Sequence, residues 1–127
     1  TVYRVINYRS MRYFTVDEFD SPDLPGSGEF MDQDFLDLLD KARERAGVPF
    51  RITSGYRSEQ HNKDVGGVKN SSHRYGLAAD ISCVNSARRF LIIEALLYVG
   101  FTRIGVADTF IHVDLNTNKQ HNLIWTY

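Results

Sequence analysis

A single cysteine, Cys83, is the feature that most restricts how this chain of 127 residues can fold. One thiol excludes an internal disulfide and any zinc site built from several thiolates. A hydrophobic core must therefore hold the fold, and a chain of this size buries roughly two-thirds of its unfolded surface, which is enough for one. Any metal has to be bound by carboxylates and by the histidines, which are His61, His73, His112 and His121.

Charge and apolar patterning restrict the partners. Fifteen basic and 16 acidic residues leave a formal net charge of -1, and no run of lysine and arginine provides the footprint of a nucleic-acid-binding protein. The longest apolar stretch, residues 90–99, is about half as long as a membrane-spanning helix. No signal peptide is visible at the start of the sequence. We expect residues 1–127 to form one monomeric domain that binds no nucleic acid and has no transmembrane segment.

Turn residues and hydrophobic spacing predict an α+β fold. Residues 2–19 are interpreted as extended chain and residues 20–29, with two prolines and two glycines, as a loop. Helical spacing of apolar residues predicts a helix after Asp32, and Ser58 is a plausible cap for a shorter one. Strands are predicted over residues 49–54, 77–83, 102–106 and 110–115. This order predicts a mainly antiparallel sheet with flanking helices.

The most apolar helix is predicted over residues 87–99. Ser86 is interpreted as its N-cap and Gly100 as its stop signal. We expect its buried stripe to consist of Phe90, Ile93, Leu96 and Leu97.

Residues 71–80 (SSHRYGLAAD) contain the most informative pattern. His73 lies in a predicted loop and Asp80 in the next strand, and Gly76 permits a turn between them. Zinc accepts neutral imidazole and carboxylate ligands, and a carboxylate in the apolar strand LAADI would be costly without a cation nearby. The alternative interpretation is a loop histidine and a strand aspartate that pairs with an arginine.

Residues 110–115 (FIHVDL) place another histidine on a strand. Because side chains alternate along a strand, the aliphatic residues would face the core, while His112 and Asp114 share the opposite face. That face suits a metal ligand with an acidic neighbour, and the alternative is a polar, solvent-exposed face on an edge strand. Two histidines and one aspartate would leave a position for water, as catalytic zinc sites do.

Residues 53–58 (TSGYRS) place Arg57 just after a strand and a glycine turn. A guanidinium group there can bind an oxyanion or a carboxylate, although the same sequence is also typical of a surface turn. Tyr56 is the aromatic residue most suited to contact a substrate, because it is next to Arg57.

In this order, TSGYRS, SxHxxGxAxD and FxHxD resemble the zinc D-Ala-D-Ala metallopeptidases over about residues 14–115. This superfamily includes D-alanyl-D-alanine carboxypeptidases and dipeptidases, L-alanyl-D-glutamate endolysins of phages, and the hedgehog signalling domain. The resemblance is greatest to its short peptidoglycan-peptidase branch. It implies a hedgehog-like α+β fold, Zn²⁺ as cofactor, peptidoglycan stem peptides as partners, and hydrolysis of peptide bonds next to D-amino acids. It leaves open whether the enzyme is a carboxypeptidase or an endopeptidase, and in which compartment it reaches the cell wall.

The resemblance also implies residue roles. His73 and Asp80 match the first two zinc ligands, and His112 matches the third. Arg57 matches the arginine that stabilises the oxyanion on the attacked carbonyl. Ser71 would support the ligands from outside the coordination sphere.

The sequence departs from the better-known members at the acid–base group. They carry Glu, Asp or His two or three residues before the third ligand, where this chain has Phe110 and Thr109. Of the two nearby carboxylates we choose Asp114 as the catalytic candidate, although it could instead orient a ligand, and Asp108 is the alternative. The departure keeps two other functions open, a non-catalytic zinc-binding module of the same fold and an interaction domain without metal.

Three further residues are expected to be structural. His61 should lie on the surface of the short helix, and His121 should be solvated in a polar tail. Cys83 should be buried at the end of its strand.

Overall fold

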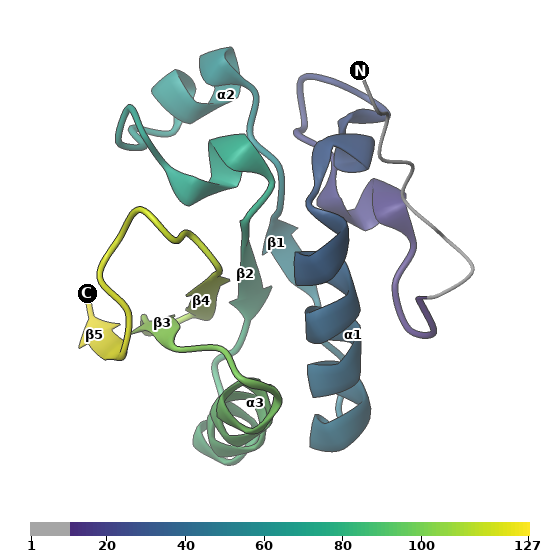
Figure 1. The fold of residues 1–127 in the computed structure, drawn as a ribbon, viewed down its shortest axis with the longest axis vertical. Coiled ribbons are helices and arrows are strands. Elements are labelled where there is room, and N and C mark those ends of the chain that lie inside the picture. Colours follow the sequence, from purple (N-terminus) through teal and green to yellow (C-terminus); the bar gives the residue numbers. More distant parts are fainter. Residues whose placement is uncertain (1–10) are drawn as a thin grey trace.

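The computed structural model describes residues 11–127, and Figure 1 shows their arrangement. The predicted extended segment lies partly outside these residues, and its described part is not extended throughout. Met11 and Phe14 are buried in the core, and Val16–Phe19 form a 3-10 helix. The Glu18 carboxylate helps to cap the N-terminus of this helix, because it accepts a 2.7 Å hydrogen bond from the Thr15 backbone amide.

Five strands form one mixed sheet in the order β1-β2-β4-β3-β5. The bounds are Ile52–Ser54 (β1), Ala78–Ser82 (β2), Arg103–Val106 (β3), Phe110–Asp114 (β4) and Leu123–Thr126 (β5). The first four pair antiparallel, whereas β5 pairs parallel with β3. The predicted α+β class with a mainly antiparallel sheet is confirmed, while β5 was missed because it follows a polar segment that resembles a tail.

Helix α1, Gln33–Ala46, begins and ends where the sequence predicts. The Asp32 carboxylate accepts a 3.0 Å hydrogen bond from the amide of Phe35, which satisfies an otherwise free donor of the first turn. Gly47 ends the helix with a φ of 69°, a conformation that favours glycine. A second 3-10 helix, Ser27–Phe30, precedes α1 and overlaps the end of the predicted loop.

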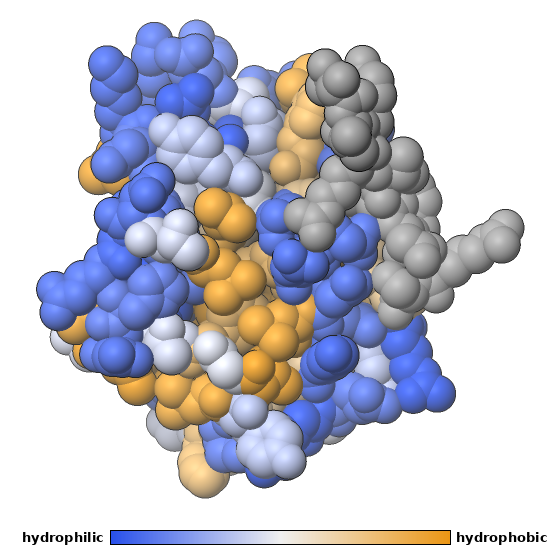
Figure 2. Space-filling model, in the orientation of Figure 1, coloured by the Kyte–Doolittle hydropathy of each residue, from blue (hydrophilic) through white to orange (hydrophobic). Residues whose placement is uncertain are grey.

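Helix α3, Ser86–Val99, packs against α1, but its buried face differs from the predicted one. Its buried residues are Ile92, Ala95 and Leu96, whereas Phe90 is 62% exposed and Leu97 46% exposed. Apolar side chains occupy most sides of this helix, so spacing alone does not identify the face that packs. The N-cap is also one residue earlier than predicted, because the Asn85 side chain accepts from Arg88. Figure 2 shows apolar surface over this helix.

Two short helices connect β1 to β2. Ser58 caps α2, Glu59–Asp64, as predicted, by accepting a 3.0 Å hydrogen bond from the amide of His61. The 3-10 helix Ser72–Tyr75 then ends at Gly76, whose φ is 70°. Within residues 11–127, no helix is long and apolar enough to cross a membrane.

Candidate metal centre

One row of residues runs across the sheet and carries the site. In this row Asp80 of β2 pairs with His112 of β4, His112 pairs with Gly105 of β3, and Gly105 pairs with Trp125 of β5. Because side chains of one row share a face, Asp80, His112 and Trp125 lie on the same side of the sheet. The sheet therefore brings together residues that are far apart in the sequence.

His73 reaches this row from the 3-10 helix that precedes β2. The Ser71 hydroxyl accepts a hydrogen bond from the His73 amide, at 3.3 Å, and the chain then reverses at Gly76. A side chain at Gly76 would collide with the backbone around Phe30 and Met31, so only glycine permits both the turn and this close approach. The turn predicted between His73 and Asp80 is confirmed.

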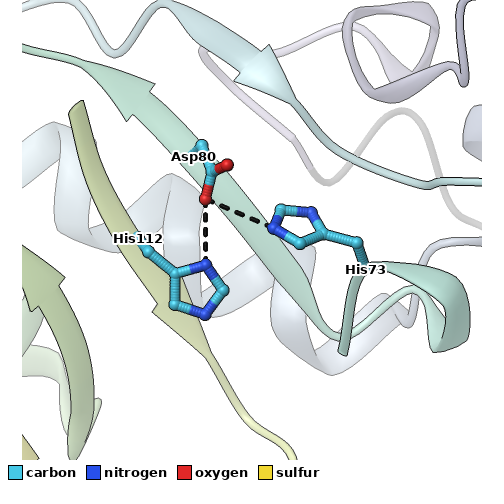
Figure 3. Close-up of side chains that lie close together, drawn as sticks. All are labelled: His73, Asp80 and His112. Atoms are coloured by element: carbon cyan, nitrogen blue, oxygen red, sulfur yellow. Dashed lines mark hydrogen bonds and ion pairs between the residues drawn. The ribbon is translucent and has the colours of Figure 1, made fainter. Parts of the chain in front are cut away.

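Three buried side chains converge here, as Figure 3 shows. Oδ1 of Asp80 lies 2.9 Å from Nδ1 of His112 and 3.3 Å from Nε2 of His73. One donor atom from each residue lies within 4.8 Å of the other two. His73, Asp80 and His112 are thus close enough together to hold one metal ion.

Hydrogen bonds to the outer ring nitrogens fix how each imidazole faces Asp80. Nδ1 of His73 is 2.8 Å from the carbonyl oxygen of Gly55, and Nε2 of His112 is 2.7 Å from Oδ2 of Asp114. Both partners accept, so these outer nitrogens carry protons, and the inner nitrogens face Asp80. The donor set is one that zinc accepts, with each histidine oriented by an outer partner as in known zinc sites.

The same contacts shift the pKa values of the cluster. Burial favours the neutral form of Asp80, but the hydrogen bonds with His112 and His73 outweigh it and hold the pKa of its carboxyl well below the usual range. Burial also disfavours a charged His112, yet the bonds to Asp114 and Asp80 raise its pKa above the ordinary histidine value. Both shifts show that the two buried groups stabilise each other's charged form.

Asp114 is buried and both of its oxygens accept hydrogen bonds. Oδ2 binds His112, while Oδ1 accepts from Nε of Arg103 at 2.9 Å and from the Asn116 amide at 3.1 Å. His112 and Asp114 share a face, as predicted. The alternative of an exposed face on an edge strand is wrong, because β4 lies between β2 and β3 and both side chains are buried.

Arg57 lies beside the cluster. Its Nη2 is 3.6 Å from Oδ2 of Asp80, so the aspartate contacts an arginine as well as the two histidines. Nε of Arg57 donates to the Ser54 hydroxyl at 3.1 Å, and Nη1 donates to the Asn62 side-chain oxygen at 3.4 Å. Gly67 makes this arrangement possible, because a Cβ there would collide with the Asn62 side chain. These contacts fix the guanidinium group at the edge of the site.

The cluster opens into a cavity of about 390 Å³. Its lining includes Arg57, Val68, Ser71, Ser72, His73, Asp80, Arg103, Phe110, His112, Asp114, Lys119, Trp125 and Tyr127. Sequence reasoning missed five of these, Val68, Arg103, Lys119, Trp125 and Tyr127. Lys119 lies in the segment 116–122, which was predicted to be a polar tail, while Trp125 and Tyr127 lie in and just after β5, for which no element was predicted. The run of β-branched and aromatic residues over 124–127 (IWTY) was the available signal for a strand.

Trp125 reaches the site because Gly105 has no side chain. The indole lies directly over Gly105, where a Cβ would be 2.7 Å from its ring atoms. Its ring centroid is 5.6 Å from that of His112, and the guanidinium carbon of Arg103 lies 4.8 Å from the indole centroid. The tryptophan therefore covers the side of His112 that faces β3 and β5.

His121 differs from its prediction, since it is half-buried and hydrogen-bonded. Its Nδ1 is 2.6 Å from the hydroxyl of Thr102, and its Nε2 is 2.9 Å from the carbonyl oxygen of Asn116. The segment interpreted as a solvated tail is thus bound beside β3, and His121 connects Asn116 of this segment with Thr102, the residue before that strand.

The other sequence candidates lie outside the lining of this cavity. Asp108 is exposed in the turn between β3 and β4, where the Ala107 amide donates to the carbonyl of Phe110. His61 is half-buried on α2, and Tyr56 packs against the core. Cys83 is buried just after β2, as predicted.

The fold and the site together define an α+β domain with a buried histidine–aspartate–histidine cluster that could hold a metal. A family model described as Peptidase M15 matches residues 12–114, which include all three motifs. The chain belongs to this family of D-Ala-D-Ala carboxypeptidase-type zinc peptidases, and the resemblance seen in the sequence is confirmed. No curated protein matches the sequence significantly.

Proposed function

We propose that this protein is a zinc-dependent peptidase that hydrolyses peptide bonds next to D-amino acids in bacterial peptidoglycan. The observation that carries the proposal is the convergence of three donor atoms in a cavity beside a fixed guanidinium group, in a chain of the Peptidase M15 family. When bound, zinc supplies Lewis acidity and lowers the pKa of a bound water molecule to about 7.

The ion would be held by Nε2 of His73, Oδ1 of Asp80 and Nδ1 of His112. The carbonyl of Gly55 and the carboxylate of Asp114 keep the outer nitrogens protonated, so the inner nitrogens stay available as ligands. The buried row on the sheet holds these groups before any ligand arrives, which reduces the cost of arranging them on binding.

Arg57 would bind the carbonyl oxygen of the scissile bond as negative charge develops on it. Burial lowers the pKa of its guanidinium, and the charge of Asp80 partly offsets this effect. An arginine remains charged throughout the neutral range. Ser54 and Asn62 orient the group, so it needs little rearrangement when the substrate binds.

Asp114 is proposed to position His112 rather than to transfer the proton. Burial favours its neutral form, but the bonds with His112, Asn116 and Arg103 lower the pKa of the carboxyl below its ordinary value. An ionised group whose two oxygens already accept hydrogen bonds is poorly suited to donate a proton to a leaving amine. The geometry thus supports the second of the two roles that the sequence left open for this residue.

The second candidate function is a non-catalytic zinc-binding module. One observation favours it. The only carboxylates among the described lining residues are Asp80 and Asp114, and both already have partners, which leaves neither free to transfer a proton to the leaving amine. Such a protein would bind stem peptides without cleaving them.

Mass spectrometry of purified peptidoglycan after digestion with zinc-loaded protein separates the two candidates. We expect new stem-peptide fragments with the wild type and none with His73→Ala, while His61→Ala on α2 should behave like the wild type. Release of terminal D-Ala would identify a carboxypeptidase, and cleavage within the stem an endopeptidase. Full zinc occupancy without any product would contradict the proposal and favour the binding module.

A further inference from the structure

The loop between β4 and β5, residues 115–122, carries Lys119 to the lining of the metal cavity. Lys119 is half-buried, and its backbone amide donates to the carbonyl of Asn116 at 3.3 Å. The lysine therefore lies in a turn at the cavity and belongs to neither strand.

The first part of this loop is fixed to the residues that carry the metal ligands. The Asn116 side chain donates to the Ser72 hydroxyl at 3.0 Å, and Ser72 begins the 3-10 helix that holds His73. Asn116 also accepts, through its side-chain oxygen, from the amide of Asn118 at 3.0 Å. Asn116 and Ser72 are both buried, so the bond between them is shielded from water.

The second part is fixed to β3. His121 bridges Thr102 and the carbonyl of Asn116, and the Gln120 carbonyl accepts from Nη1 of Arg103. Lys119 is thus presented by a loop that is bonded on both sides. Fixing the loop before binding lowers the entropy lost when its side chain contacts a ligand.

The charges lining the cavity leave Lys119 without a counter-ion. Arg103 pairs with Asp114 at 2.9 Å, and Arg57 lies 3.6 Å from Asp80. Lys119 forms no ion pair with any residue in the range 11–127. A half-buried lysine that lines a cavity and has no counter-ion among residues 11–127 favours a ligand that carries negative charge.

We propose that Lys119 binds a carboxylate of the substrate while the scissile bond lies at Arg57 and the metal ligands. The inference rests on the proposed function and adds a substrate class, namely peptides with a free carboxylate near the bond that is cleaved. In a stem peptide that carboxylate is either the C-terminal one or the α-carboxyl of an isoglutamyl residue.

The test compares three synthetic peptides of sequence acetyl-L-Ala-D-isoGlu-L-Lys-D-Ala-D-Ala. One is unmodified, one has an amidated C-terminus, and one has an amidated isoglutamyl carboxyl. For the wild type we expect one of the two amidations to raise KM by about tenfold, as for loss of one charge-assisted hydrogen bond. The amidation that does so identifies the carboxylate. We expect Lys119→Ala to show the same loss on the unmodified peptide and no response to amidation.

Two matched variants control for charge and folding. Lys119→Arg should recover most of the affinity, because it restores the positive charge, and Lys41→Ala removes an exposed lysine of α1 and should match the wild type. Equal KM values for all three peptides with the wild type, or an unchanged response to amidation in Lys119→Ala, would overturn the role of Lys119 while leaving the peptidase intact.

Calorimetry keeps this inference separate from the proposed function. The peptidoglycan digestion decides whether the proposed function fails. If none of the three peptides is cleaved, the same peptides are titrated into wild type and Lys119→Ala. If the wild type binds one amidated peptide about tenfold more weakly than the unmodified peptide, and Lys119→Ala shows no such difference, carboxylate recognition by Lys119 would still be supported. Equal binding of all three peptides would overturn it.

Discussion

The two walls of the cavity are held in place by different contacts. Buried side-chain hydrogen bonds to a backbone carbonyl and to two carboxylates hold the metal wall, formed by His73, Asp80 and His112. The C-terminal wall, formed by Lys119, Trp125 and Tyr127, depends on the hydrogen-bonded loop 115–122, on the parallel pairing of β5 and on ring packing over Gly105. The difference suggests that the first wall determines whether a metal binds, and that the second determines what substrate reaches it.

The largest effect is expected at the metal wall. Asp80→Asn removes the charge that both histidines face, and we expect the protein to lose both bound zinc and hydrolytic activity. Elemental analysis after dialysis measures the first and peptidoglycan digestion the second. Asp108→Asn, in an exposed turn, is the matched control and should retain both. Zinc content equal to that of the wild type in Asp80→Asn would contradict the assignment of this ligand.

Asp114→Asn should have the next largest effect. It keeps the shape of the side chain but removes the charge that orients His112, and losing such an outer partner typically weakens metal affinity by about 10–100-fold. Competition with a fluorescent zinc chelator measures the affinity. A lower kcat with zinc affinity unchanged would instead indicate that Asp114 transfers a proton.

Zinc should stabilise the folded chain. An ion that binds only the folded state adds about 2.7 kcal/mol when its free concentration is a hundred times Kd. For a domain of this size we expect the midpoint of thermal unfolding to rise by roughly 10 °C over the chelator-treated protein. Differential scanning calorimetry measures the shift, and His112→Ala should show none.

The smallest effect is expected at the C-terminal wall. Gly105→Ala places a methyl group against the indole of Trp125, and overpacking of this kind typically costs about 1–3 kcal/mol of unfolding free energy. Zinc affinity should change much less than in Asp114→Asn. Denaturant unfolding measures the loss of stability, and chelator competition measures the zinc affinity. A loss of zinc affinity as large as that of Asp114→Asn would show that the two walls are not independent.

The metal wall was predictable from the sequence because its signals are local. The spacing of His73, Gly76 and Asp80 indicates a turn into a strand, and alternation in FIHVDL places His112 and Asp114 on one face. The histidine contact of Asp114 follows from that spacing of two residues. Its second partner, Arg103, lies on a neighbouring strand and could not be paired without the register of β3 and β4.

The C-terminal wall was missed for the opposite reason. Parallel pairing of β5 with β3 is specified by backbone hydrogen bonds between segments separated by a hairpin and a polar loop, which leaves little local pattern. The buried face of α3 was also wrong, because a helix with apolar residues on most sides needs its neighbours to determine which side packs. In both cases the missing information is tertiary.

The position of the metal ligands also has a mechanical consequence. Asp80 and His112 lie 32 positions apart in the sequence, on strands β2 and β4. A bound ion would cross-link them as a disulfide does. In the chain-entropy model of disulfides, a cross-link that closes a loop of this length stabilises the fold by about 3–4 kcal/mol, because it lowers the entropy of the unfolded chain. A protein whose only cysteine is buried and alone would thereby gain a removable cross-link, released by chelation instead of reduction.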